Sequence, residues 1–146
     1  MMKTIWILAA NAGRARLFSA TSRNGALIEE QAWLDNEARM KGRDIVTDRQ
    51  GRTFDGSGRP GYAMEPRVDV KSEEANRFAR LLCRMLGEQA DRKGCERLHI
   101  VASPAFLGRL REFMKHSLRN RISSELPKDL TTLDARALRR HLPDYL

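Results

Sequence analysis

Long apolar runs are absent from this sequence. Its most apolar early stretch, from Ile5 to Ala10, is about as long as one buried strand, and charge returns at Arg14. A membrane-spanning helix needs about 20 apolar residues. A secretory signal peptide needs a longer apolar segment than this one, followed by a small-residue cleavage site. The sequence therefore predicts no membrane span and a cytoplasmic location.

Cysteine and histidine are also scarce. Cys83 and Cys95 fit neither a disulfide framework nor a zinc spacing, and Cys83 is expected to be a small core residue. His99, His116 and His141 are scattered, and none lies at ligand spacing from Cys, Asp or Glu. His99 stands between two apolar residues of a predicted strand, which favours a hydrogen-bonded structural role. We expect no metal and no cofactor.

Two other signatures of catalysis are missing. No nucleophile elbow of the form Gly-x-Ser-x-Gly follows a strand. Gly56-Ser57-Gly58 resembles a phosphate cradle only superficially, because no Gly-x-x-x-x-Gly-Lys-Ser/Thr motif accompanies it. Neither covalent hydrolysis nor nucleotide hydrolysis is predicted.

Aromatic residues make up only 6% of the chain, so a base-stacking platform for single strands is poorly supported. Positive charge, by contrast, is plentiful: the formal net charge is +8 and the pI is about 10.2. Such a balance suits a polyanionic partner, either nucleic acid or an acidic surface. A well-solvated basic surface without a partner is the alternative.

The pattern of apolar residues predicts an α/β fold in one domain, residues 1–146. Three strands are expected first, at 4–10, 14–20 and 26–34, joined by Asn/Gly turns as an antiparallel meander. A long helix starting at Ser72 and ending near Gly94 should lead into a strand at 97–102. This strand–helix–strand unit implies a parallel pair with a right-handed crossover.

The remaining elements complete a mixed β-sheet with helices packed on it. Ser103-Pro104 should begin the next helix, because proline at the first helical position loses no needed donor. Residues 121–126 fit either a strand or a helical continuation. Thr132 or Asp134 should start a short last helix that runs to Leu142. Six residues are expected to be core: Phe78, Leu82, Met85, Ile100, Leu110 and Phe113.

A Gly-rich loop is predicted between the meander and the long helix, at about 35–70. It carries five glycines and seven charges of each sign. Compact domains rarely keep roughly 35 residues without secondary structure unless the loop is functional or disordered. Its candidate functional residues are Arg52, Gly56, Ser57, Gly58, Arg59 and Gly61.

Aspartates in this loop allow one further hypothesis, a metal-dependent hydrolase built on Asp44, Asp48, Asp55 and Asp69. A two-metal site needs carboxylates on a rigid frame, about 4 Å from ion to ion. These four lie among arginines on a predicted loop, so solvated salt bridges are favoured.

Basic residues on the predicted helices are candidates for phosphate contacts. Arg77, Arg80 and Arg84 recur at helical spacing away from the apolar face, and two acidic neighbours at i,i+4 partly neutralise them. A second basic segment follows. The full candidate nucleic-acid-binding set is Arg77, Arg80, Arg84, Arg109, Arg111, Lys115, Arg119 and Arg121.

Several segments in this order resemble one bacterial family, the host attachment proteins, also called proteins required for attachment to host cells. They are TIWILAANAGRARLF, the Gly-rich loop, Asn76-Arg77-Phe78-Ala79, HIVASPAFLGRLR and ELPKDLTTL. The resemblance covers nearly the whole chain. It implies a role connected with attachment to host cells.

That family is similar in fold to the central domain of archaeal and eukaryotic class-one peptide release factors. The similarity implies a release-factor-like fold and a ribosome, rRNA or tRNA as partner. In release factors, a loop before the main helix carries a catalytic Gly-Gly-Gln. This chain has no such motif, and Lys71-Ser72-Glu73 occupy the matching positions. Peptidyl-tRNA hydrolysis is therefore not carried over, which favours a protein that is not an enzyme.

The sequence thus favours a release-factor-like basic domain that associates with RNA or the ribosome without catalysis. The alternative is a protein-interaction module that acts in attachment or surface behaviour, in which the loop binds a protein partner. A metal-dependent hydrolase is the weakest of the three hypotheses.

Overall fold

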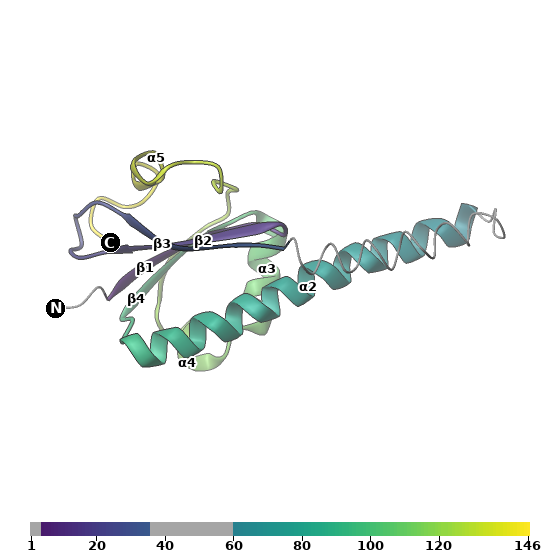
Figure 1. Cartoon of the computed structure of the whole chain (residues 1–146), viewed down its shortest axis with the longest axis horizontal. Helices are drawn as coiled ribbons and strands as arrows, with labels where there is room; N and C mark the ends of the chain where they lie inside the picture. Colours follow the sequence, from purple (N-terminus) through teal and green to yellow (C-terminus); the bar gives the residue numbers. More distant parts are fainter. Residues whose placement is uncertain (1–3, 36–59) are drawn as a thin grey trace.

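A five-stranded mixed sheet forms the centre of the protein, with helices on one face and a C-terminal segment on the other (Figure 1). The structure, a computed structural model, describes residues 4–35 and 60–146, with side chains at 4–35 and 70–146. The strand order is β3-β2-β1-β4-β5. This arrangement confirms the predicted α/β class.

The N-terminal part is the predicted antiparallel meander. It consists of β1 (Ile5–Ala10), β2 (Arg14–Ala20) and β3 (Ile28–Leu34). Asn11 makes the first turn tight, because its side-chain oxygen accepts hydrogen bonds from the backbone N–H groups of Gly13 and Arg14, at 2.8 and 2.9 Å. The turn predicted from Asn11 and Gly13 is therefore present between β1 and β2.

Two parallel pairs extend the sheet on the other side of β1. Helix α2 (Pro60–Lys93) leads to β4 (Arg97–Ala102), which runs parallel to β1. Helices α3 (Pro104–Phe113) and α4 (His116–Arg119) then lead to β5 (Ile122–Leu126), parallel to β4. The open choice at 121–126 therefore resolves as a strand, and a short α5 (Ala135–Arg139) follows.

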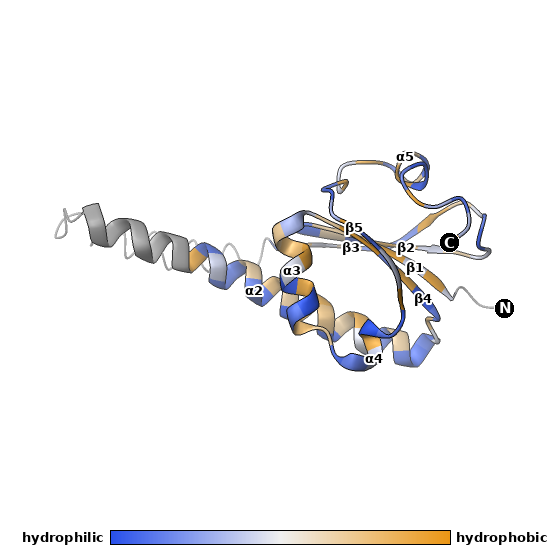
Figure 2. Ribbon diagram, turned by 180° about the vertical axis from the view of Figure 1, so that it is seen from behind, coloured by the Kyte–Doolittle hydropathy of each residue, from blue (hydrophilic) through white to orange (hydrophobic). Residues whose placement is uncertain are grey.

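Burial on both faces explains why β1 is apolar throughout: all six of its residues are buried. On one face, Trp6, Leu8 and Ala10 pack under α2, α3 and α4. On the other face, Ile5, Ile7 and Ala9 pack under the C-terminal segment. In Figure 2, hydrophobic residues run along β1 and β4, and hydropathy alternates along α2.

Four of the six predicted core residues are fully buried, and two are not. Phe78, Leu82, Ile100 and Leu110 are each at most 2% exposed. Met85 and Phe113 are only half-buried, although Phe113 packs against the helical side of the core. Both lie where the apolar stripe of their helix turns outward, a detail that helical spacing alone does not resolve.

Helix α2 begins at Pro60, twelve positions before the predicted start, so the prediction of a loop to about residue 70 is wrong for its last ten residues. Ser72 is a residue type that is favoured at the N-cap, but it lies inside the helix. Helix nucleation is costly and propagation is not. Once the half of α2 that packs on the sheet has formed, extension toward Pro60 adds little cost, and Pro60 suits the first helical position.

The ends of the other helices follow their sequence signals closely. Gly94 ends α2 with a φ of +78°, the left-handed conformation that glycine adopts without strain. Asp134 caps α5, because its side chain accepts a hydrogen bond from the N–H of Ala137 at 2.7 Å. Ser103 precedes α3 as predicted, but its side chain makes no capping hydrogen bond.

Candidate nucleic-acid interface

Some candidate residues of the predicted Gly-rich loop lie outside the described residues, and others lie in helix α2. Arg52, Gly56, Ser57, Gly58 and Arg59 lie outside the described residues, as do Asp44, Asp48 and Asp55. Gly61 and Asp69 lie within α2, so neither belongs to a loop. The positions that match the release-factor tripeptide, residues 71–73, also lie inside this helix. The predicted release-factor-like placement of a loop directly before them is therefore wrong.

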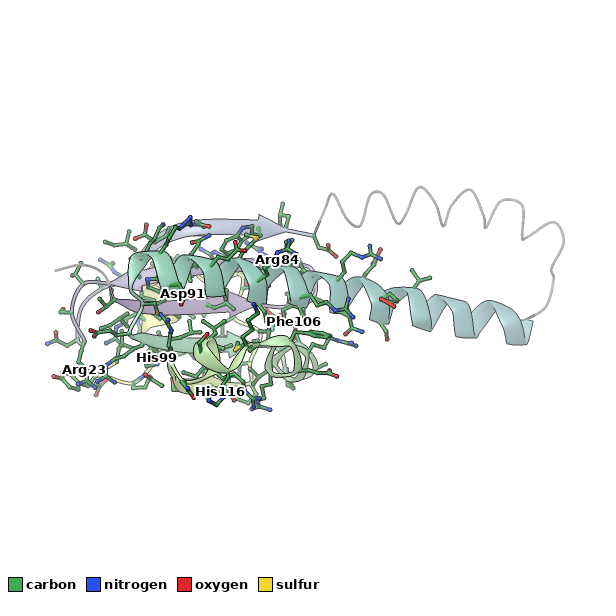
Figure 3. All side chains as sticks on the ribbon, turned by 90° about the horizontal axis from the view of Figure 1, so that it is seen from below. Arg23, Arg84, Asp91, His99, Phe106 and His116 are labelled. Atoms are coloured by element: carbon green, nitrogen blue, oxygen red, sulfur yellow. The ribbon has the colours of Figure 1, made fainter. Side chains whose placement is uncertain are left out.

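The basic stripe predicted on α2 is present. Arg77, Arg80 and Arg84 are exposed, and they lie opposite the residues that α2 buries against the sheet. Figure 3 shows Arg84 on the helical side of the molecule. Arg77 and Arg84 are seven residues apart, or about 10 Å along the helix axis. They therefore project from one rigid rod in nearly the same direction.

The neutralising partners predicted along this stripe do not engage it. Within residues 70–146, Arg77 and Arg84 form no ion pair with Glu73, Glu88 or any other side chain. An exposed ion pair gains little because water screens it and the side chains lose rotamer freedom. No described side chain therefore neutralises either guanidinium group.

Arg80 is held differently from its two neighbours. Its guanidinium lies over the ring of Phe113 on α3, 4.7 Å from the ring centroid. This cation–π contact covers the half-buried ring and leaves the charge at the boundary between α2 and α3. Arg80 thus contributes positive charge at a fixed place, while Phe113 is not open for stacking.

Two predicted binding residues on α3 make polar contacts within the protein. Arg109 donates a hydrogen bond to Asn76 on α2 at 2.6 Å and so joins the two helices. Arg111 pairs with Glu125 on β5 at 2.5 Å. They leave α3 on opposite flanks, toward α2 and toward β5. The two residues therefore do not extend the α2 stripe.

Arg121 is the clearest case of a structural arginine among the candidates. Its Nη1 donates to the carbonyl oxygens of Ala90 and Cys95, at 3.0 and 2.7 Å, and its Nη2 donates to Asp91 at 2.8 Å. The Ala90 carbonyl also accepts from the backbone N–H groups of Gly94 and Cys95, at 2.8 and 3.1 Å, so Arg121 adds a side-chain donor to a backbone cap at the end of α2. Because both of its Nη atoms donate within the protein, its role as a phosphate ligand is not supported.

Lys115 and Arg119 remain exposed at α4, beside the C-terminal half of α2. Neither forms an ion pair among the residues with described side chains. His116 lies on the same small helix and is also exposed, as Figure 3 shows. We define the helical basic surface by the five predicted candidates that are exposed on α2 and at α4 and form no ion pair with a described side chain: Arg77, Arg80, Arg84, Lys115 and Arg119.

Sequence reasoning missed a polar cluster at the opposite layer. Asn11 donates to Asp129 at 2.9 Å and to Thr131 at 3.2 Å, and Asp129 accepts two further hydrogen bonds from Thr131. Burial raises the pKa of Asp129, but these hydrogen bonds outweigh it and lower the pKa overall. Arg16 donates to the carbonyls of Thr131 and Leu133. The cluster ties the C-terminal segment to the β1–β2 turn.

No sequence signal links these residues, because more than a hundred positions separate the two sides of the cluster. Its hydrogen-bonding groups are used within the protein, which indicates a structural role. Among the described residues, no group of three or more His, Cys, Asp or Glu side chains could hold a metal ion. No described helix is long and apolar enough to cross a membrane.

Both buried cysteines behave as core residues. Cys83 is 6% exposed and lies between α2 and α3, as predicted, and Cys95 is 3% exposed. Burial raises the pKa of Cys83 to about 12. Burial likewise raises the pKa of Cys95 to about 11, although the nearby Arg121 opposes it. Neither thiol is poised to act as a nucleophile, because the reactive form is the thiolate.

Comparison with known proteins gives one strong similarity. The model of a family described as "Protein required for attachment to host cells" matches residues 6–142. No curated protein matches the chain. None of these results supports the release-factor similarity that the sequence resemblance implied.

Among solved structures, the chain is similar to a Ppx/GppA phosphatase of Aquifex aeolicus, the type II variant. The two are 15% identical with a TM-score of 0.41 over 86% of this chain. The match spans only 35% of the phosphatase chain.

The family match covers all of the described strands and helices except the first residue of β1, and it agrees with the resemblance seen in the sequence. The chain belongs to the family of proteins required for attachment to host cells.

Proposed function

We propose that this protein is a non-catalytic RNA-associated factor that binds phosphate groups through the helical basic surface. One observation carries the proposal. Arg77 and Arg84 project from the same side of a long helix and have no ion-pair partner among the described side chains. Arginine is well suited to phosphate because its planar guanidinium donates two parallel hydrogen bonds.

The surface suits the phosphate backbone better than exposed bases. The described aromatic side chains on the helical side are buried or half-buried, and Arg80 covers Phe113. Recognition of single strands relies on aromatic rings that stack on bases. We therefore expect a structured RNA, bound through its backbone, as in recognition of RNA by shape and phosphate position.

Ribosomal RNA and tRNA are structured RNAs of this kind, and the release-factor resemblance motivated them as partners. The placement of residues 71–73 within α2 removes the loop on which that resemblance rested. The charge of the helical surface now supports an RNA partner by itself. Such a partner would place the protein in the cytoplasm, and we propose that location together with it.

The test is binding of a fluorescent RNA duplex, measured by anisotropy from 50 to 300 mM NaCl. We compare the wild type with Arg77→Glu/Arg84→Glu, and with the matched control Arg136→Glu/Arg140→Glu on the opposite side of the sheet. The first variant should lose affinity and show a shallower salt dependence, because fewer counterions are released on binding. The control should bind like the wild type.

Equal affinity loss in both double variants would reduce the effect to net charge and overturn the proposed surface. Wild-type binding by the Arg77/Arg84 variant would overturn it as well. Sedimentation of lysate through a sucrose gradient at low and moderate salt then asks whether the ribosome is the partner. The ribosome is excluded if the protein stays at the top of the gradient at every salt.

The family description favours a second candidate, a protein-interaction module in attachment to host cells. Pull-down with and without ribonuclease separates the two. Partners that survive ribonuclease support the second candidate, whereas partners that disappear support the first.

A further inference from the structure

The face of the sheet opposite the helices is covered by one C-terminal segment. We call residues 127–146 the C-terminal strap. Its buried side chains, Leu138, Leu142 and Leu146, pack with Ile7 and Val101 and the other apolar residues on this face of β1, β2 and β4. Figure 1 shows the strap crossing this face, and among the described residues no further element lies above it. The strap has little regular structure, since α5 is only five residues long.

Two arginines fasten the far end of the strap. Arg139 on α5 donates to the carbonyl oxygens of Gly25 and Arg23, at 2.9 and 3.3 Å. Arg23 donates from Nε to the Leu146 carbonyl at 2.6 Å and lies over the ring of Tyr145, 4.0 Å from its centroid. The Leu146 N–H donates back to the Arg23 carbonyl at 2.7 Å. These contacts hold the strap to the β2–β3 turn.

A buried histidine lies on the sheet face that the strap covers. His99 pairs with Ile7 in the register of β1 and β4, so its side chain leaves the sheet on the same face as Ile7 and Val101. His99 is 2% exposed. Its Nδ1 lies 2.6 Å from the Ser124 hydroxyl oxygen on β5, while its Nε2 is buried and has no hydrogen-bond partner within residues 4–35 and 60–146. The ring is therefore satisfied only in part, which refines the predicted structural role.

Three arginines act on the ring through their positive charge. Burial lowers the pKa of His99, and Arg97 on β4, Arg139 on the strap and Arg23 on the β2–β3 turn lower it further. Glu125 on β5 leaves the sheet on the other face, where it pairs with Arg111. β1 contributes no ionisable side chain. Figure 3 shows Arg23 and His99 toward the same end of the sheet.

We propose that His99 is an acid-sensitive latch whose protonation releases the C-terminal strap from the sheet. A proton added at Nε2 would create a buried N–H without an acceptor and a cation beside three guanidinium groups. When the strap is displaced, water reaches the His99 ring, and Arg139 moves away from the ring with the strap. We expect the strap to move and the sheet to stay. The strap is a single segment with little regular structure, whereas β1, β4 and β5 are joined by the hydrogen bonds of the sheet.

The direction of the pH effect follows from linkage. A histidine whose folded-state pKa is lowered stabilises the closed form fully above its unfolded value, about 6.5. That stability falls as the pH drops below about 6.5, toward the folded-state pKa. The opening equilibrium should then increase by up to about tenfold per pH unit.

Hydrogen exchange of strap peptides from pH 7.5 to 5.0, corrected for intrinsic rates, tests the latch. Protection of residues 135–146 in the wild type should fall by about tenfold or more, while peptides of α2 and α3 keep theirs. His99→Gln keeps a partner for Ser124 but does not titrate, so its strap protection should stay level. His141→Gln, on the exposed side of the strap, is the matched control and should behave like the wild type.

Unchanged strap protection in the wild type over this range would overturn the latch, as would an equal fall in His99→Gln. A second measurement uses only the wild type, so it does not depend on whether a variant folds. The ring resonances of His99, followed by NMR, should titrate over the same pH range as strap opening. Titration of the ring without opening, or opening without titration, refutes the coupling.

Discussion

At the scale of single residues, three arginines of the predicted binding set illustrate different uses of one side chain. Arg121 ends a helix by binding carbonyl oxygens, Arg80 covers an aromatic ring, and Arg84 projects without an ion-pair partner among the described side chains. The sequence does not distinguish these three arginines, because each lies within a few positions of apolar residues in or next to a helix. Only long-range contacts separate a structural arginine from one that is available to a ligand, so sequence reasoning grouped them as one binding set.

Substitution of Arg121 tests this distinction. Arg121→Lys keeps the charge but loses the fork that reaches two carbonyls and Asp91 at once. We expect a loss of about 1–3 kcal/mol in unfolding free energy, the usual cost of a buried polar group left without its partner. Urea denaturation gives that value, and RNA anisotropy should show an unchanged salt slope. A changed slope with unchanged stability would restore Arg121 to the binding surface.

Phe78 should be the most costly aromatic truncation on α2. It is 2% exposed, and its ring lies 5.9 Å from that of Phe106. Phe78→Ala should lower the unfolding free energy by about 3–5 kcal/mol, because it removes buried surface and leaves a cavity. Phe113→Ala is the natural comparison, since that ring is half-buried and should cost clearly less. Equal losses in urea denaturation would contradict the burial difference between them.

At the scale of elements, the first four strands were predictable to within two residues at their starts, whereas residues 121–126 were left open between a strand and a helix. The signals were local: apolar runs bounded by Asn, Gly or Pro, as at Asn11 and Gly94. The start of α2 was not predictable in this way. Gly61 and Pro66 are helix breakers in isolation, and Ser72 followed by two glutamates is a typical N-cap sequence. The helix passes through them because its packed half supplies the nucleus.

A proline at position 72 distinguishes the two helix starts. If α2 began at Ser72, Ser72→Pro would be harmless, since proline is tolerated at the first helical positions. In a helix that begins at Pro60, the substitution removes a hydrogen bond and clashes with the preceding turn. Far-UV circular dichroism should then lose helical signal for about one dozen residues. Undiminished ellipticity at 222 nm would favour the shorter helix.

The candidate site was less predictable than the fold, and the reason lies in the same elements. Helical spacing correctly placed Arg77, Arg80 and Arg84 on the outward face of α2. It could not show that Arg109 reaches across to Asn76 or that Arg111 meets Glu125, because both partners lie on elements distant in sequence. The Asn11–Asp129 cluster escaped notice for the same reason.

At the scale of the whole molecule, the two faces of the sheet are protected very differently. Among the described residues, three helices cover one face and the strap covers the other. Burial of apolar area stabilises both layers. The helical layer, however, is reinforced by backbone hydrogen bonds within each helix, whereas the strap is held mainly by side-chain hydrogen bonds to the two β-turns. Local opening is therefore expected first on the strap side.

The position of β1 also shapes the order of events during synthesis. This strand emerges first, yet its parallel partner, β4, follows about 90 residues later, and the strap later still. At a translation rate of about 5–20 residues per second, both apolar faces of the first hairpin stay bare for several seconds. Pairing over such a separation is also intrinsically slow. The buried centre of the finished protein is thus the most aggregation-prone part of the growing chain, and its nascent form should depend on chaperones.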